Sequence, residues 1–213
     1  MEKRRPFNLK TIIIPYNFTL VVLSAYMFHE LFMAAWMSGY SLKCQPADYS
    51  YNYLPMRMAR AGWWFFFSKV IELMDTVFFI MRKKSNQLTF LHVYHHSTMV
   101  INCWLGVKYV GGGQAFFQAM LNSFIHIVMY LYYGMAAIGP HMQKYLWWKR
   151  YLTSMQLMQF VAILTHTTVN FFSDCEFPQV YNVAVMAYSV SLIILFSNFY
   201  YQEYVKRASQ KKQ

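Results

Sequence analysis

The segment Phe90–Met99 reads FLHVYHHSTM and brings three histidines together in apolar surroundings. His92, His95 and His96 are spaced i, i+3 and i+4, so a helix would place their imidazoles on one face. An imidazole can bind a metal ion, move a proton or act as a nucleophile. The alternative is a set of buried histidines that only pack, and the box alone does not decide among these roles.

Three further segments carry polar side chains in apolar surroundings, namely KVIELMDT, NSFIHIVMYLYY and TSMQLMQF. At about 100° per residue, the polar positions of each segment fall on one helical face. Ionisable groups inside apolar segments mark candidate functional sites. The alternative is that these groups have a structural role alone and form ion pairs or hydrogen bonds that hold helices together. The candidates outside the histidine box are Lys69, Glu72, Asp75, Asn122, His126, Tyr130, Tyr133, Gln156 and Gln159.

The elements that must position these side chains are long apolar helices. Of the 213 residues, 57% are hydrophobic and 13% are charged, which is about half the charged fraction of a soluble domain. No period-two alternation is visible, and lipid admits only helices or closed barrels. We therefore predict an all-α polytopic membrane protein with one domain over residues 1–213. Since a span needs about 20 residues, the six predicted spans are residues 12–36, 57–81, 88–110, 114–138, 151–172 and 180–201.

The predicted spans bring the candidate side chains to a common depth. At a rise of 1.5 Å per residue, Asp75, His95 and Gln156 lie roughly 10 Å from helix ends on the same side of the membrane. Gln159 and His126 lie roughly 13 to 18 Å from that side. Independent structural histidines would have no reason to share such a layer. We therefore predict one active site that opens to this side, with an apolar region behind it.

The net charge of +11 at pH 7 is distributed by side of the membrane. With the N-terminus in the cytosol, most lysines and arginines fall in cytosolic segments, which is the positive-inside pattern. They include Lys3 and Arg4 near the start, and Lys211 and Lys212 near the end. We therefore predict that both ends of the chain are cytosolic. Nucleic-acid binding has no support beyond the charge, whereas a basic rim would attract anionic lipid or an anionic substrate carrier.

Two of the three cysteines fall in loops on the opposite side of the membrane. Cys44 follows the first predicted span, and Cys175 precedes the last. If that side is the lumen of the endoplasmic reticulum, it permits disulfides, so we predict a Cys44–Cys175 bond against the alternative of two free thiols. Cys103 lies inside a span, about 12 Å along the helix from His95. With no cation nearby its thiol stays protonated, which makes it a weaker nucleophile candidate.

The number of histidines weakens the interpretation of the box as a metal site. Membrane fatty-acyl desaturases and hydroxylases carry the same H-x-x-H-H pattern, but they hold two irons with several such boxes. This chain has seven histidines and one box, so a di-iron oxidoreductase is short of ligands. A single metal bound by the box and His126 stays open. In the other interpretation, an imidazole attacks an activated acyl group and a carbon nucleophile captures the acyl-imidazole, with Asp75 or a second histidine setting the tautomer.

Four segments in this order, KVIELMDT, HVYHH, NSFIHIVMYLYY and TSMQLMQ, resemble the signature motifs of the very-long-chain fatty acid elongases. These are membrane 3-ketoacyl-CoA synthases of the endoplasmic reticulum. The resemblance runs from about residue 5 to residue 201 and includes MRKKSNQ and QKYLWWKRYLT. It implies residence in the endoplasmic reticulum membrane and a helical barrel around an acyl-chain tunnel. Family members usually have a seventh span before the segment that matches residues 1–10.

The resemblance implies condensation of a long-chain or very-long-chain acyl-CoA with malonyl-CoA to give 3-oxoacyl-CoA, CO2 and CoA, without a metal or other cofactor. It implies that His95 accepts the acyl group and that His126 lies near the thioester. His92 and His96 would shape and polarise the site, and Asp75 would support this network. The substrate-binding residues that it implies are Lys69, Glu72, Asn122, Tyr130, Tyr133, Gln156 and Gln159.

The implied partners are acyl-CoA, malonyl-CoA and the lipid bilayer, together with other elongase chains and the reductases and dehydratase of the elongation cycle. Three other classes of protein stay open besides an elongase. One is the di-iron oxidoreductase, and another is a transporter or lipid-binding membrane protein that uses the same polar layer without chemistry. The third is an inactive chain that only associates with longer elongases.

Overall fold

The computed structural model describes residues 5–210, and every regular element in that range is a helix. The long helices are α1 (Lys10–Met37), α2 (Tyr53–Glu72), α4 (Phe90–Tyr109), α5 (Phe116–Ile138), α6 (Lys149–Phe171) and α7 (Gln179–Tyr200). The short ones are α3 (Met74–Met81), α8 (Arg207–Gln210), the 3-10 helices η1 (Gly113–Ala115) and η2 (Pro140–Tyr145), and the π-helix η3 (Tyr201–Lys206). The all-α prediction is confirmed for this part of the chain. The predicted cytosolic residues Lys3, Arg4, Lys211 and Lys212 lie outside it.

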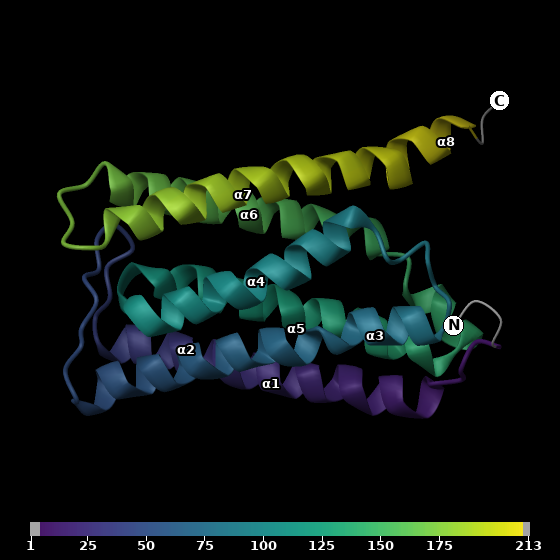
Figure 1. Ribbon diagram of the computed structural model, residues 1–213, viewed down its shortest axis with the longest axis horizontal. Helices are drawn as coiled ribbons and strands as arrows, with labels where there is room; N and C mark the ends of the chain where they lie inside the picture. The colour runs from purple at the N-terminus through teal and green to yellow at the C-terminus, as the bar shows by residue number, and fades with distance from the viewer. Residues whose placement is uncertain (1–4, 211–213) are drawn as a thin grey trace.

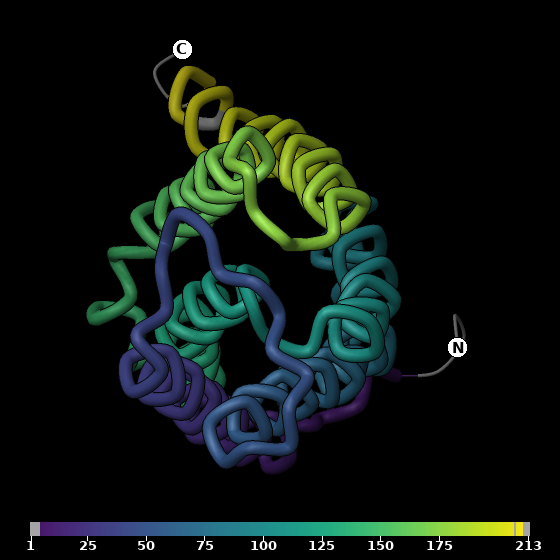
Figure 2. The backbone as a smooth tube through the Cα atoms, turned by 90° about the vertical axis from the view of Figure 1, so that its left-hand side faces the viewer, coloured from purple at the N-terminus to yellow at the C-terminus, as the bar shows by residue number. Residues whose placement is uncertain are grey.

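The axes of the six long helices are roughly aligned, as Figure 1 shows. Viewed along that direction in Figure 2, they follow one another around a ring in the order α1, α2, α4, α7, α6 and α5. The α1–α5 pair is packed closely, with Leu20, Met27 and Leu31 at 1% exposure or less. Gly134 of α5 makes close approach possible, because a Cβ there would lie 3.3 Å from the Phe18 ring.

Within residues 5–210, three helical stretches are long and apolar enough to cross a membrane, namely Lys10–Met37, Gly113–Ile138 and Gln179–Gln210. They contain three of the six predicted spans, those at residues 12–36, 114–138 and 180–201. The other three predicted spans are also helical here, as α2 with α3, α4 and α6. Their polar residues, which include the histidine box and both motif glutamines, make these helices less apolar.

The predicted span at residues 57–81 is wrong in one respect, because it is not a single helix. It consists of α2 and α3, which meet at Leu73. The amide of Leu73 donates to the carbonyl of Val70 (3.3 Å), and that of Thr76 to the carbonyl of Leu73 (3.1 Å). These i to i−3 bonds are the tighter 3-10 pattern. A uniform 100° spacing therefore does not relate Glu72 to the residues of α3.

The segment 38–52 crosses one end of the bundle (Figure 2), which we call the disulfide end. Its Cys44 is bonded to Cys175, the pairing that the sequence predicts. The carbonyl of Leu42 accepts a hydrogen bond from Nε2 of Gln114 at 2.8 Å. Gly113 has φ +54°, and a Cβ there would lie 2.8 Å from the backbone nitrogen of Ala47. The turn before α5 therefore packs directly against this segment.

Replacing Cys44 with serine is expected to lower the stability of the fold markedly. The bond joins residues 131 apart in sequence, and loop-closure entropy gives roughly 4 to 5 kcal/mol for loops of this order. On a non-reducing gel, Cys44→Ser should run with the reduced parent, and its Tm in detergent should fall as the parent's does on reduction. Cys103→Ser should keep the parent's mobility, because Cys103 is free. A parent in which Cys44 and Cys175 are both alkylated without reduction would contradict the bond.

Candidate active site

The orientation of the histidine box follows from where α4 begins. Thr89 precedes the helix, and its hydroxyl accepts a hydrogen bond from the His92 amide at 3.2 Å, which makes it an N-cap. The helical period then places the three histidines on one side of α4. The ring centroids of His92 and His96 lie 4.3 Å apart, and those of His95 and His96 lie 5.3 Å apart. The three imidazoles are therefore adjacent, as their spacing predicts.

A second polar group lies between α2 and α5 and is fully buried. It comprises Lys69, Glu72, Asn122 and His126, which we call the Lys69 cluster, and none of its members is more than 7% exposed. Nζ of Lys69 lies 2.9 Å from Oε1 of Glu72, 2.9 Å from Oδ1 of Asn122 and 3.3 Å from Nδ1 of His126. An ammonium has three donors, and each has a partner when Nδ1 of His126 carries no proton. Such saturation is what a buried charge requires.

His126 is fixed within this cluster by one of its two ring nitrogens. Its Nδ1 lies 3.3 Å from the ammonium of Lys69 and 3.2 Å from Oε1 of Glu72. The ring nitrogen that is engaged determines which one remains for other partners. Nε2 is therefore the ring nitrogen that remains for another partner, although His126 is buried between α2 and α5 and does not line the cavity described below.

The short helix α3 connects the histidine box to α5. Oγ1 of Thr76 lies 2.9 Å from Nε2 of His92. On the same helix, the carboxylate of Asp75 accepts a hydrogen bond from the hydroxyl of Tyr130 at 3.1 Å. Asp75 therefore contacts α5 and not the histidines, whereas Thr76 holds His92 in place.

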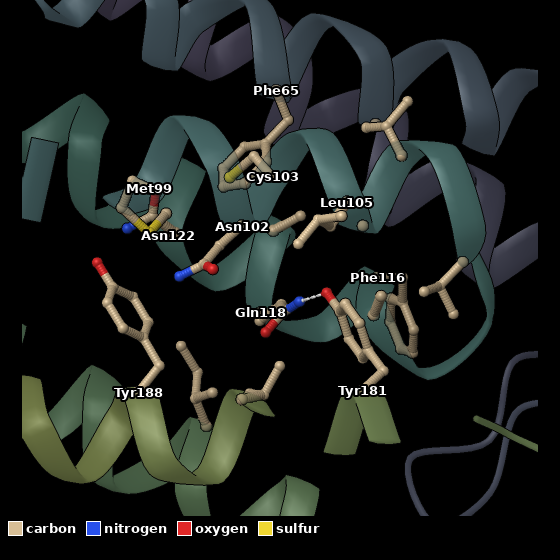
Figure 3. Close-up of a pocket in the computed structure, with 18 of the residues that line it drawn as sticks. Phe65, Met99, Asn102, Cys103, Leu105, Phe116, Gln118, Asn122, Tyr181 and Tyr188 are labelled. Atoms are coloured by element: carbon tan, nitrogen blue, oxygen red, sulfur yellow. Dashed lines mark hydrogen bonds between the residues drawn. The ribbon is translucent and has the colours of Figure 1, made fainter. Parts of the chain in front are cut away.

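A cavity of about 160 Å³ lies between α2, α4, α5, α6 and α7 (Figure 3). His95, Asn122 and Gln159 line it together, so three of the helices that carry sequence motifs meet at one space. From there the cavity follows α4 to Val110, roughly 22 Å at 1.5 Å per residue. Most of this length is lined by apolar side chains such as Phe65, in agreement with the apolar region predicted behind the site.

Of the predicted site residues within residues 5–210, His95, Asn122 and Gln159 line this cavity and the others do not. Nε2 of Gln156 lies 3.4 Å from Sδ of Met129, so this amide does not bond to the histidines. Tyr133 is 44% exposed and does not line the cavity. His166, on the face of Gln159 but deeper, bonds to Gln114 at 2.8 Å at the disulfide end. Depth along a helix does not fix the direction in which a side chain points, and this is why the common layer included too many residues.

The arrangement of the histidines bears on the metal interpretation. Within residues 5–210, no three His, Cys, Asp or Glu side chains are grouped so that they could hold a metal ion. Nε2 of His92 is directed at Thr76. A metal bound by the box and His126 would lie near the Lys69 ammonium, and repulsion between like charges opposes that position.

Two residues near the site were missed from the sequence. The hydroxyl of Tyr188, on α7, lies 3.0 Å from Oγ1 of Thr98 and 3.5 Å from the carbonyl oxygen of His95. It also lines the cavity. Ser68 places its hydroxyl 3.4 Å from the Glu72 carboxylate. Ser68 directly precedes KVIELMDT and was within reach of that motif, whereas nothing in the apolar run around Tyr188 distinguishes it.

The sequence of this chain was compared with those of protein families and of known proteins. The sequence model of the ELO: GNS1/SUR4 family matches residues 1–212. Very long chain fatty acid elongase 4 of Macaca mulatta and that of Homo sapiens are each 54% identical over 204 residues, or 96% of this chain. Very long chain fatty acid elongase 7 of Drosophila melanogaster is 46% identical over 213 residues. The chain spans 65% of the length of each of these relatives. The resemblance drawn from the four motifs is thereby confirmed, and the chain belongs to the ELO family.

Proposed function

We propose that this chain is a fatty acid elongase that condenses a long-chain or very-long-chain acyl-CoA with malonyl-CoA, giving 3-oxoacyl-CoA, CO2 and CoA. The observation that carries the proposal is the position of His95, at the polar end of a long apolar cavity. An acyl chain fits an apolar cavity of this shape, while its thioester would lie at the histidines. The names of the relatives, very long chain fatty acid elongases, support the same reaction.

The proposal places the six long helices across the endoplasmic reticulum membrane, as one domain and a barrel around the acyl chain. Three stretches with the length and composition of spans support this placement, as does the ring order of the helices. A disulfide forms in an oxidising compartment, so the disulfide end is assigned to the lumen. The histidine box then faces the cytosol, where acyl-CoA, malonyl-CoA and the reductases and dehydratase of the cycle would meet it.

In the first step, a ring nitrogen of His95 attacks the thioester carbonyl of the acyl-CoA. The new C–N bond forms as the C–S bond breaks, and the proton of the imidazole leaves with the thiolate as CoA–SH. His96, whose ring lies 5.3 Å from that of His95, is the neighbour assigned to move this proton. His92, held by Thr76, packs against His96 and keeps it in position.

In the second step, malonyl-CoA loses CO2, and the resulting enolate carbon attacks the acyl group on His95. A C–C bond forms, the C–N bond breaks, and the imidazole takes up a proton from solvent, which replaces the one that left with CoA–SH in the first step. Nε2–H of His126 is assigned as the donor to the enolate oxygen, because this tautomer leaves Nδ1 to accept from the Lys69 ammonium. Both steps are acyl transfers, so the proposal uses no metal or other cofactor.

Expression in a cell that lacks its own elongases tests this function. We expect membranes with the chain to incorporate label from malonyl-CoA into 3-oxoacyl or elongated products, and the cell's fatty acids to shift to longer chains. Membranes that contain the folded chain but form no labelled product would contradict the proposal. Binding of acyl-CoA without any product would favour a lipid-binding or transport protein instead.

Replacing Thr76 with valine is expected to reduce elongation about five- to tenfold, because it removes the hydrogen bond to His92 and keeps the side-chain volume. Serine at this position should restore the rate, since it keeps the hydroxyl. Thr168→Val is the matched control, because the Thr168 hydroxyl donates to the carbonyl of Leu164 at 2.7 Å, on α6 and away from the histidines. Initial rates with labelled malonyl-CoA measure the effect, and a full rate for Thr76→Val would remove His92 from the account.

A further inference from the structure

Asn102 is a polar side chain in the apolar part of the cavity. It lies on α4, seven residues beyond His95 toward the disulfide end, and it lines the same cavity. Figure 3 shows its amide pointing into the space between α4 and α7. Leu105 lies one turn further along the helix and also lines the cavity. The amide therefore faces the space that the proposed function gives to the middle of the acyl chain.

The Asn102 amide has no hydrogen-bond partner within residues 5–210. Two other cavity amides are bonded, because Gln118 donates to the hydroxyl of Tyr181 and Asn122 accepts from Lys69. Gln159 also has no hydrogen-bond partner within the described residues, but it lines the cavity at the polar end, with His95. The Asn102 side chain is exposed, so its amide can be hydrated, and an apolar chain lying against it would remove that water without replacing the hydrogen bonds. Polar side chains within membrane helices either bond to a neighbouring helix or face a cavity or a substrate path. Asn102 belongs to the second kind.

We propose that Asn102 recognises a hydroxyl group in the middle of the acyl chain, so that mid-chain hydroxylated acyl-CoAs are substrates. This inference rests on the proposed function. An amide both donates and accepts, and a hydroxyl does the same, so one alcohol satisfies both halves of the side chain. An unsubstituted chain would leave the amide unpaired.

The helix geometry gives the position of that hydroxyl along the chain. His95 and Asn102 are seven residues apart, which is roughly 10 Å along the axis of α4. An extended chain advances roughly 1.2 Å per backbone bond. The recognised hydroxyl therefore lies about eight or nine bonds from the carbonyl carbon that is bound to His95.

Competition between substrates tests the proposal. Stearoyl-CoA competes for elongation with hydroxystearoyl-CoAs whose hydroxyl lies near the carboxyl end, near the middle or near the methyl end. We expect the parent to prefer the mid-chain alcohol to the other two. Asn102→Leu removes the amide and keeps its size, so the ratio of kcat/KM for the mid-chain alcohol to that for stearoyl-CoA should fall about tenfold.

Moving the amide is the sharper experiment. In the Asn102→Leu background, Leu105→Asn places an amide three residues further along α4, roughly 4.5 Å toward the disulfide end. The preferred hydroxyl should then move toward the methyl end of the chain. An equal ratio in the parent and Asn102→Leu, or a parent without positional preference, would overturn the proposal and leave Asn102 as a residue that binds only water.

A binding measurement separates this inference from the proposed function. Non-reacting thioether analogues of the same acyl-CoAs are added to the purified protein, and the rise in Tm is recorded. The mid-chain alcohol should raise the Tm of the parent more than the stearoyl analogue does, and this difference should vanish in Asn102→Leu. A parent that elongates nothing but shows this difference would reject the proposed function and keep the recognition by Asn102. Equal shifts for the two analogues in the parent would reject the recognition.

Discussion

Replacing His95 with alanine is expected to lower kcat/KM for elongation by at least about a thousandfold, because removal of a nucleophile eliminates the covalent route. The His95 side chain lines the cavity, whereas the adjacent His96 does not. The His96 imidazole therefore cannot replace it as the nucleophile. Rates with labelled malonyl-CoA in membranes with equal amounts of protein measure the loss. His95→Ala should still be stabilised by an acyl-CoA thioether analogue, because the apolar cavity is retained.

Ser97→Ala is the control for His95→Ala. Ser97 is exposed on the same helix, and its hydroxyl donates to the backbone carbonyl of Val93 at 2.7 Å. Its replacement should leave elongation within about twofold of the parent, since substitutions at exposed positions outside buried polar networks and helix caps change stability little. Elongation by His95→Ala at the rate of Ser97→Ala would assign the nucleophile to another residue.

Replacing Lys69 with methionine is expected to destabilise the fold by about 3 to 5 kcal/mol, because it leaves the Glu72 carboxylate buried without its cation. The side chains of Lys69 and Glu72 are 3% and 2% exposed, so solvent cannot take the place of the lost partner. The Tm in detergent should fall clearly. Elongation should fall as well, because His126 loses one of the groups that orient it.

The double variant Lys69→Met with Glu72→Leu separates stability from chemistry. Replacing a buried ion pair by apolar residues is often neutral or stabilising, so the double variant should recover much of the Tm while elongation stays lost. Lys149→Met is the control. Nζ of Lys149 lies 3.2 Å from Oε1 of Glu203, and the Lys149 side chain is 50% exposed. Such surface ion pairs contribute little to stability. A double variant that regains full activity would mean that the Lys69 cluster only holds α2 against α5.

Much of the fold follows from the sequence because lipid allows few alternatives. Long apolar blocks predict helices, and the spacing of the three histidines fixes a common face once Thr89 starts α4. The Cys44–Cys175 pairing follows from placing both loops on one side of the membrane. These inferences depend on local periodicity and on the order of the segments, which one chain carries in full.

The features of the site that could not be predicted from the sequence depend on tertiary contacts. The break between α2 and α3 at Leu73 is not marked by a proline or glycine in the sequence. Because of this break, Asp75 accepts a hydrogen bond from Tyr130, and Thr76 is the residue that bonds to His92. Gln156 and Gln159 occupy the same predicted arc, yet only Gln159 lines the cavity. The direction of a side chain depends on how its helix is rotated against its neighbours, and no single-helix pattern contains that rotation.

The central claim is that the acyl group is carried by His95, and intact-protein mass spectrometry tests it most directly. The purified protein is incubated with a long-chain acyl-CoA in the absence of malonyl-CoA. One added acyl mass is expected, located on the peptide that contains His95, absent from His95→Ala and discharged when malonyl-CoA is added. No added mass in a preparation that elongates, or an acyl group located on Cys103, would contradict the account.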